Sequence, residues 1–412
     1  MGLLIGNVPN SILPERVKQA INANIPAYGV KFASNSAVGT RTFDATDLTW
    51  SRSNNTDAGI DDFKNLAPFN VKEVCRVWDG SNATYLYKSN YSDDEWQQIR
   101  TGKHDTISGD IMIEFPEFWY HRVNTPNGLE IIVSPEYKAG FTPDPWHYSK
   151  GVHHEKRYIT KYNISSGYKS ISGVAPTVNT NMNTFRAGLQ AKGLNLLSAP
   201  AWWSIGMLML VKYASTDMQA TVSAGWNSGN ASRVSGNADN VKGLDGSATL
   251  VTANEGALTF GIENLYGNIW KYVDGCFSYD YYLYIKDVED MTIDPTSLAD
   301  LQSSYTKIDT ISRSGGSNTA ITSIANDNIY DWFMFPSNAT NSSSTIVCND
   351  NFWSAGGLRL LIVGGSAWLG SADGLFCFNS NNAVGNSNVN NGAVDTGKRL
   401  KAYLTLYYLC VS

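Results

Sequence analysis

The sequence is poor in histidine, and its cysteines are few and far apart. All five histidines lie at or before residue 154 of 412, so the rest of the chain supplies no histidine for a general base, a catalytic triad or a zinc site. The five cysteines include no C-x-x-C pair. Their odd number and wide spacing indicate neither a disulfide framework nor a zinc knuckle. We therefore expect buried free thiols.

The sequence also lacks the short motifs that mark common enzyme classes. It contains no G-x-x-x-x-G-K-[ST], no G-x-G-x-x-G after a strand and no G-x-S-x-G. The cluster His153-His154-Glu155 does not have the spacing of H-E-x-x-H and predicts an exposed polar turn. The acidic segment 286–291 predicts a solvated loop, because a glycosidase needs two carboxylates held across a cleft. We expect no catalytic residues, no cofactor and no metal.

Positive charge and long apolar runs are scarce as well. The net charge is -6 and the isoelectric point is about 5.4, which disfavours binding to nucleic acid. The N-terminus has neither the basic region nor the apolar core of a signal peptide. The longest apolar run, residues 199–211, is shorter than the ~20 residues that span a bilayer. We therefore expect no signal peptide, no membrane insertion and synthesis in the cytosol.

Glycine and aromatic residues, by contrast, are plentiful. The chain has 36 glycines, 22 tyrosines and 12 tryptophans, which is typical of β-rich structure with many turns. Its length predicts two or three domains. Residues 1–24 contain one short helix, Leu13 to Asn22, which could attach the chain to a partner. Residues 25–154 predict a β-rich domain with a central strand at Ile111–Phe115, ended by Pro116.

From about residue 155 the pattern changes to helices and short strands. A helix is predicted at Thr184–Leu194. A second begins near Ser198, with Pro200 in its first turn and one apolar stripe as far as residue 214, so we expect a core helix. Residues 155–412 should form one α+β domain in which Trp270 and Trp332 are buried. The last residues, 402–412, predict a strand.

The segment 358–400 has an unusual composition. Between Arg359 and Lys398 it has no basic residue and only two acidic ones, and seven asparagines fall within residues 379–391. Asparagine tolerates left-handed turns and bonds its own backbone, which favours structural turns. Uncharged amides and hydroxyls also suit adaptable recognition, which favours a binding loop. The composition alone leaves both interpretations open.

Three segments together resemble the formylglycine-generating-enzyme-like branch of the C-type lectin fold. Residues 261–270, GIENLYGNIW, followed by KYVD, resemble the signature G-x-x-x-x-x-G-N-V-W-E-W. Residues 329–337 resemble the segment that precedes the variable region in such proteins. Residues 358–366, 374–379 and 398–400 resemble the variable region of proteins diversified by retroelements. The resemblance implies a C-type-lectin-like domain over 155–412, with a variable region at about 358–400, preceded by the β-rich domain.

The resemblance also implies which residues bind the ligand. In these proteins, template-directed mutagenesis replaces adenines, mostly in asparagine codons. Such replacement reaches Ser, Asp, Ala, Leu, Ile and Cys but not Trp, so Trp368 is expected to be fixed scaffold or a fixed aromatic contact. The predicted ligand-binding set is Ile362, Ser366, Ala367, Trp368, Leu369, Ser371, Asp373, Cys377, Asn379, Ser380, Asn382 and Asn386.

A division between surface and core follows from this assignment. We expect the side chains of Ser366, Leu369, Ser371 and Asp373 to point outward on one continuous face. Leu375, Phe376 and Phe378 should point mostly inward.

The function that the resemblance implies is that of a receptor-binding protein of a phage or prophage. Its partners would be a host cell-surface protein or glycan and, through the N-terminal region, other tail or baseplate proteins. It would be found in the virion, or in the host cytoplasm before assembly. Relatives at fibre tips are trimers, so a homotrimer is one expected assembly and a monomer is the other.

The alternatives are an enzyme of the sulfatase-modifying-factor type, a tail-spike depolymerase, or a purely structural protein. The formylglycine-generating enzymes carry two reactive cysteines, for which only Cys348 and Cys377 are candidates here. Neither has a neighbouring cation in sequence that would lower its pKa, so the oxidase activity is not carried over. The calcium-binding motifs of animal C-type lectins are also missing.

Overall fold

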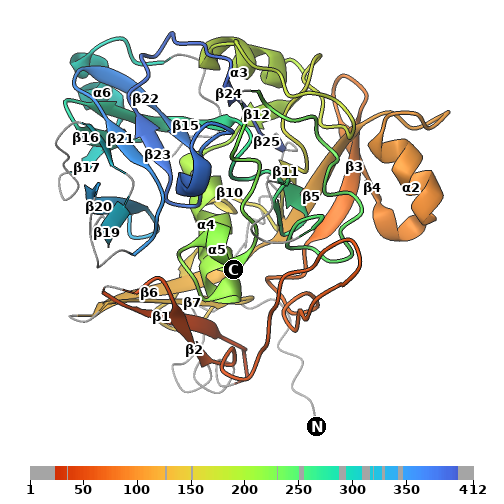
Figure 1. Ribbon diagram of the computed structural model, residues 1–412, viewed down its shortest axis with the longest axis horizontal. Coiled ribbons are helices and arrows are strands. Elements are labelled where there is room, and N and C mark those ends of the chain that lie inside the picture. The colour runs from red at the N-terminus through yellow and green to blue at the C-terminus, as the bar shows by residue number, and fades with distance from the viewer. Residues whose placement is uncertain are drawn as a thin grey trace, which may run out of the picture.

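The computed structural model describes residues 24–34, 36–125, 128–149, 152–229, 231–249, 255–286, 294–308, 316–318, 320–326, 330–341 and 347–397. The expected helix at 13–22, the strand at 402–412 and the segment 398–400 lie outside these residues. The described part has an α+β architecture, in which mostly antiparallel sheets surround one central helix (Figure 1). Within it, no helix is long and apolar enough to cross a membrane.

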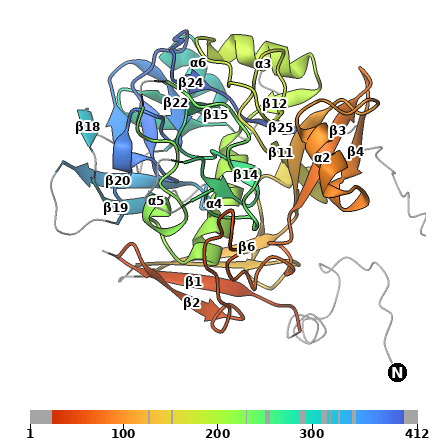
Figure 2. The ribbon, with the colours of Figure 1, turned by 45° about the vertical axis from the view of Figure 1, so that its right-hand side comes forward.

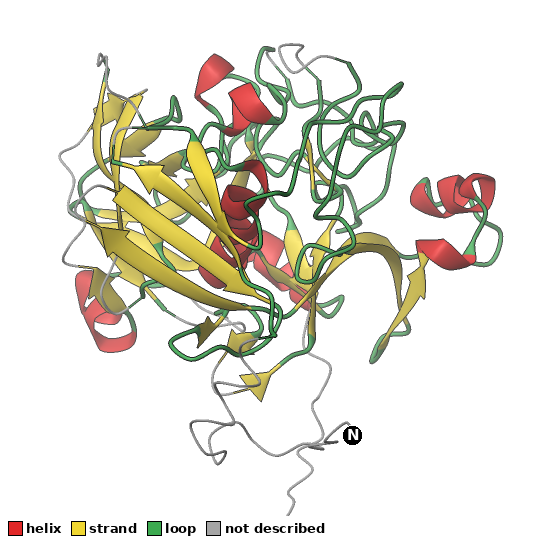
Figure 3. Cartoon of the chain, turned by 90° about the horizontal axis from the view of Figure 1, so that it is seen from below, coloured by secondary structure: helices red, strands yellow, loops and turns green. Residues whose placement is uncertain are grey.

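The central helix is α4 (Ala199–Tyr213). Ser198 caps it by accepting a hydrogen bond from the Ala201 N–H, and a proline lies in its first turn, as predicted. All its residues are buried, because sheets and loops pack on every side of it (Figure 3). The predicted core helix is confirmed.

A five-stranded antiparallel sheet packs below α4 (Figure 2). It is built from the N-terminal part of the chain, and its inward residues Val30, Ile131 and Val133 are fully buried. In spatial order its strands are β2 (Gly39–Phe43), β1 (Tyr28–Ala33), β7 (Gly128–Ser134), β6 (Trp119–Thr125) and β8 (Thr142–Pro143).

A six-stranded sheet joins the two predicted parts of the chain. Its strands, in order, are β12 (Leu194–Leu196), β25 (Asp395–Gly397), β11 (Lys156–Thr160), β5 (Asp110–Pro116), β3 (Lys72–Trp78) and β4 (Ala83–Tyr87). The predicted central strand is β5, which pairs with β3 on one side and β11 on the other. The sheet therefore continues across residue 155, where the sequence suggests a domain boundary.

The third sheet carries the predicted variable region. Its path is β17 (Thr306–Ile308), β16 (Tyr282–Ile285), β15 (Trp270–Tyr279), β22 (Leu358–Val363), β23 (Phe378–Ser380), β21 (Phe352–Ser354) and β18 (Gly316–Asn318), with β24 (Asn391–Gly392) added on β15. Trp270 and Trp332 are 3% and 6% exposed, so their predicted burial is confirmed.

The other elements are short. Helix α3 has its N-cap at Asn181 and ends four residues earlier than predicted, because Gly193 adopts a left-handed φ of 66° and Leu194 begins β12. The helices are α2 (Asp93–Arg100), α3 (Met182–Gln190), α5 (Met218–Thr221), α6 (Leu298–Ser304), η2 (Lys88–Asn90) and η3 (Gly370–Ala372). The remaining strand pairs are β9 (Tyr148–Ser149) with β10 (Val152–His153), β13 (Leu258–Thr259) with β14 (Ile262–Glu263), and β19 (Ala320–Asn326) with β20 (Met334–Thr340).

Buried apolar side chains form one large cluster and two smaller ones. The large cluster, called the first core, runs from Tyr28 to Val394 and includes α4. The second core lies on the other face of the third sheet and includes Phe185 of α3, Trp270 and Tyr272. The first core draws on both predicted parts, which pack together in this structure.

Candidate functional site

Strand β22 separates the two cores at the start of the predicted variable region. Leu361 and Val363 point into the first core, and Leu360 and Ile362 point into the second. This alternation follows from the two-residue period of a strand. Phe376 and Phe378 continue the first core, as predicted for inward residues, and Leu375 joins them.

Ile362 and Cys377 were expected to face a ligand, and that expectation of exposure is wrong. They do lie on the face opposite the first core, but both are fully buried in the second core. The cause is the cover on this face, because side chains of α3 and Val384 of the following loop pack against the same cluster.

A sharp turn follows β22. Gly364 and Gly365 have φ values of 84° and 80°, a left-handed conformation that glycine adopts without strain. The turn brings the Ser366 N–H to the carboxylate of Asp373, with 2.9 Å between the nitrogen and Oδ1. A Cβ atom on Gly365 would lie 1.7 Å from that same Oδ1, so only glycine fits.

Ser366 and Asp373 therefore form a buried support for the turn, called the frame. The prediction that they face outward is wrong. Both are fully buried, as is Ala367. The turn is held by the Asp373 carboxylate, whose Oδ1 accepts the Ser366 backbone N–H. Burial raises the pKa of Asp373 well above its ordinary value, although Lys271 and the Ser366 N–H oppose this.

The four residues Trp368–Ser371 lie between the two frame residues and are called the tip loop. Gln219 of α5 fixes its base from one side: its amide donates to Gly370 O at 3.1 Å, and its Oε1 accepts from the Asp373 N–H at 3.1 Å. Asn227 O accepts from the Gly370 N–H at 2.9 Å. Trp368 is 38% exposed, Ser371 is exposed and Leu369 is half-buried.

The asparagine-rich segment forms a second exposed loop, residues 381–390, between β23 and β24. Asn379 Oδ1 accepts from the Asn381 N–H at 2.8 Å, and the Asn386 side-chain amide donates to Asn382 Oδ1. Asn382 and Asn386 are half-buried in this ladder, which supports the interpretation as structural turns. Asn379 and Ser380 of β23 are buried, so their expected exposure is also wrong. Asn379 lies opposite Ile362, whose face of the sheet is covered. The Ser380 hydroxyl donates to Trp353 O.

One exposed aromatic residue was not in the predicted set. Trp353, in β21, is 38% exposed, the same fraction as Trp368. It precedes the segment 358–400, and β21 is a short strand of three residues. Its alternation with buried Phe352 and Ser354 could have identified it as outward-facing.

The signature segment 261–270 organises loops rather than supplying reactive groups. Gly261, Asn264, Gly267 and Asn268 all have φ between 56° and 78°, which explains their residue types. Asn268 Oδ1 accepts from the Arg233 N–H at 2.7 Å, so the motif holds the long loop before it. Both asparagines are buried.

Glu263, in this segment, makes the stability of the folded chain depend on pH. Its buried carboxylate accepts from the Gly236 and Ala238 N–H groups at 2.9 and 3.0 Å. Burial, reinforced by Asp239, raises its pKa to about 7 from an ordinary 4.5. The folded state therefore holds this proton to a higher pH than the unfolded state does. The stability contributed by the protonated form is lost as the pH rises from about 4.5 to about 7.

We expect Glu263→Gln, which cannot lose a proton, to gain stability relative to the native chain across this window. The free energies of unfolding should diverge by up to about 3 kcal/mol above pH 7, from the shift of the pKa. Urea denaturation of both chains from pH 5 to pH 8 measures the difference. A difference that stays constant with pH would contradict this account.

The described cysteines lack the environment of a reactive thiol. Cys75, Cys276, Cys348 and Cys377 are all buried and free. Lys271 interacts electrostatically with Cys377, but burial still raises the pKa of Cys377 and of Cys348 well above the ordinary value. A thiol protonated at neutral pH is a poor nucleophile. Among the described residues there is also no cluster of His, Cys, Asp or Glu that could hold a metal.

These four thiols should resist labelling in the native protein. With a Cys410→Ser variant, which removes the one cysteine outside the described residues, we expect almost no reaction with a disulfide reagent over minutes. All four should react in guanidinium chloride. Rapid labelling of the folded variant would reopen the enzyme alternative.

The chain is similar to solved structures of the major tropism determinant. For the U1 variant the TM-score is 0.29 at 10% identity, and the similarity covers 80% of this chain and 72% of that one. For the I1 variant the TM-score is 0.30 at 9% identity, covering 92% and 84%. No family model and no curated protein matches the sequence. The function proposed below therefore rests on the residues of this chain.

Proposed function

We propose that the chain is a receptor-binding protein of a phage or prophage and that its ligand surface centres on the tip loop. The observation that carries the proposal is an exposed tryptophan, Trp368, held on a buried frame. An apolar side chain of this size normally packs inside a protein. A tryptophan fixed at the surface is instead the residue type that most often dominates a binding interface.

The chemistry around Trp368 suits recognition. Between Arg359 and Lys398 the only acidic residues are Asp373 and Asp395, and Asp373 is buried. The exposed part of the tip loop is therefore uncharged, with an aromatic anchor, an apolar neighbour in Leu369 and a hydroxyl in Ser371. Because the Gln219 and Asp373 hydrogen bonds already fix the loop, binding orders little additional chain.

The amino-acid sequence can vary at exposed positions of the tip loop and of the loop 381–390. Substitution at the exposed Ser371, Ala383 and Ser387 changes the surface while leaving both cores intact. Leu369 is half-buried and packs against the second core, so apolar replacements there keep that contact. The buried members of the predicted set, such as Ile362 and Asp373, would support these loops from the interior. We propose Trp368, Leu369 and Ser371 as contact residues, and the half-buried Asn382 and Asn386 of the loop 381–390 as further members of the binding surface.

The remaining expectations belong to the same proposal. The C-terminal domain would be C-type-lectin-like, and its target would be a host cell-surface protein or glycan. The N-terminal region, before β1, would attach the chain to tail or baseplate proteins. A homotrimer would add avidity to weak individual contacts.

Cell binding by the full chain tests the proposal. The fluorescently labelled protein is titrated against intact cells of a panel of bacterial strains, before and after protease or periodate treatment. We expect saturable binding to a subset of strains, with protease sensitivity for a protein target and periodate sensitivity for a glycan. Absence of saturable binding across strains that the phage infects would contradict the proposal.

A further inference from the structure

A polar pocket lies outside the predicted variable region. It has a volume of about 230 Å³, and none of its lining residues belongs to the variable region. It opens between α2 and the segments 58–64 and 238–244. Helix α2 lies on the opposite side of the molecule from β22 and β23 in two views (Figures 1 and 2).

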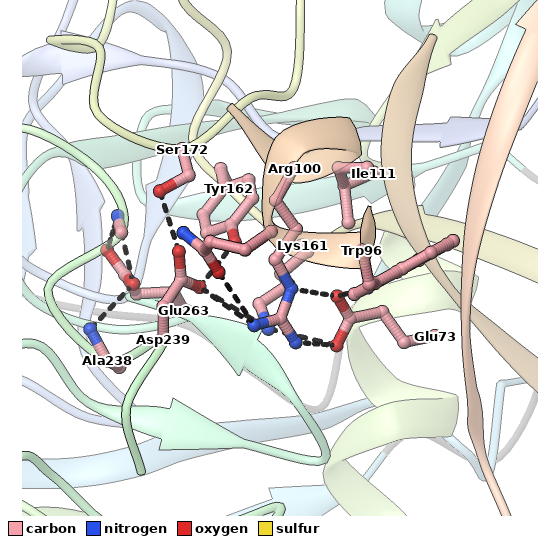
Figure 4. Close-up of polar contacts among 12 residues, drawn as sticks. Glu73, Trp96, Arg100, Ile111, Lys161, Tyr162, Ser172, Ala238, Asp239 and Glu263 are labelled. Carbon is pink, nitrogen blue, oxygen red and sulfur yellow. Dashed lines mark hydrogen bonds and ion pairs between the residues drawn. The ribbon is translucent and has the colours of Figure 1, made fainter. Parts of the chain in front are cut away.

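The floor of the pocket is a buried charge network (Figure 4). Arg100 binds Glu73 through Nε and Nη2, each at 2.6 Å from a carboxylate oxygen. Lys161 Nζ lies 3.0 Å from the same carboxylate. Asp239 accepts from the Ser172 hydroxyl at 2.6 Å and from Tyr162, and it lies 3.6 Å from Lys161. Glu263 belongs to the same network (Figure 4) and interacts electrostatically with Asp239 and Lys161, so three acidic groups face two cations.

The remaining charges of the pocket wall are mostly positive. They are Lys64, Lys88, Lys242 and Asp61. Asp61 is already held by Lys212, 2.8 Å away. Lys88 lies 3.6 Å from an exposed aspartate. The ammonium groups of Lys64 and Lys242 have no hydrogen bond or ion pair within the described part of the chain, and both residues are exposed.

Two loops, one containing residues 53–64 and the other residues 238–245, contact each other directly and so fix the pocket wall before a ligand binds. The Ser53 N–H donates to Asp245 O at 2.8 Å, and the Lys242 N–H donates to Asn54 O at 3.0 Å. A Cβ atom on Gly243 would lie 2.7 Å from Ser53 Oγ of the other loop, and one on Gly59 would lie 2.5 Å from Ser51 O within its own loop. The loops that carry Lys64 and Lys242 are thus fixed before any ligand arrives, which lowers the cost of binding.

We infer that this pocket binds an acidic sugar, that is, a single monosaccharide unit bearing a carboxylate or phosphate group. The free lysines supply the attraction for the anion, and charge-assisted hydrogen bonds of this kind are stronger than neutral ones. The polar floor and the backbone of the glycine-rich wall suit hydroxyl groups. The volume is below the roughly 300–1,000 Å³ of pockets for drug-sized ligands, which fits one sugar ring.

The site would act independently of the tip loop. It lies outside the variable region, so its affinity would persist when the variable region changes. A weak contact with a charged cell-surface polysaccharide would add to specific recognition through avidity. The pocket can therefore bind its sugar even if the proposed function of the tip loop fails.

Titration calorimetry with the full chain tests the pocket. The probes are glucuronate, glucose 6-phosphate, inorganic phosphate and neutral glucose, at low ionic strength. The test variant is Lys64→Gln with Lys242→Gln, and the matched control is Lys31→Gln with Lys103→Gln, which changes net charge equally at exposed lysines outside the pocket. We expect the test variant to weaken binding of the two anionic sugars at least tenfold and the control to leave it unchanged.

Each outcome decides the inference. Glucose should not bind, and inorganic phosphate should bind more weakly than glucose 6-phosphate. Equal binding of the two phosphates would overturn the sugar assignment. Equal weakening in both double variants, or no saturable binding of either anionic sugar, would overturn the site. Trp368→Ala should leave all four titrations unchanged, which separates this test from that of the proposed function.

Discussion

Replacing Trp368 with alanine should weaken binding of the chain to its target cells by roughly 30-fold. Truncation of a central aromatic anchor costs about 2 kcal/mol or more, and each 1.4 kcal/mol is about a factor of ten in affinity. The melting temperature should change little, because Trp368 is 38% exposed and stands on a frame that the substitution does not touch. Cell-binding titration and thermal denaturation of the same preparation measure both quantities.

The sequence offers a closely matched control for this experiment. Trp353 has the same exposed fraction as Trp368 and lies in β21, outside the tip loop. Trp353→Ala should therefore leave cell binding within twofold of the native value. Equal losses in the two variants would show that exposed tryptophans matter in general and that the tip loop is not the centre of the surface.

Gly365→Ala should destabilise the folded chain by about 2–5 kcal/mol. The new Cβ would lie 1.7 Å from Asp373 Oδ1, so the carboxylate must move and the buried Ser366 N–H loses its acceptor. An unsatisfied buried donor costs about 1–3 kcal/mol, and a left-handed backbone adds about 1–2 kcal/mol for a residue with a side chain. Urea denaturation measures the total.

Gly370→Ala separates backbone strain from the loss of the frame. Gly370 has a φ of 64° and lies in the same loop, but a Cβ there meets no atom within 4 Å. Its substitution should cost only the strain, about 1–2 kcal/mol. Similar losses at positions 365 and 370 would show that Asp373 does not support the turn as described.

Local patterns predicted the parts of the fold that depend on neighbouring residues. The cap at Ser198, the proline in the first turn and the apolar stripe define α4 because helix ends and helix faces are set within a few residues. The two-residue period of β22 likewise explains why Val363 and Ile362 point to opposite faces. The burial of Phe376 and Phe378, which the resemblance implied, is also confirmed.

Contacts between distant segments could not be predicted in this way. Nothing near Ile362 indicates that α3 and Val384 cover its face of the sheet, so a residue on the outer face was mistaken for a surface residue. Asp373 was expected outside because it was assigned to the variable surface, but it accepts the Ser366 N–H inside the turn. The pairing of β5 with β11 across the expected domain boundary is also a long-range contact.

The central claim is that the exposed tip-loop residues can change in sequence, whereas the buried frame residues Ser366 and Asp373 cannot. Its most direct test is a library with all substitutions at positions 366, 369, 371 and 373, displayed as the full chain and sorted separately for folding and for binding to target cells. We predict that position 371 tolerates most residues for folding and that position 369 tolerates apolar residues, because Leu369 packs against the second core. Substitutions at both should change target binding, and positions 366 and 373 should fail the folding sort. If folding tolerance is equal at all four positions, or if substitutions at 369 and 371 leave target binding unchanged, the account is contradicted.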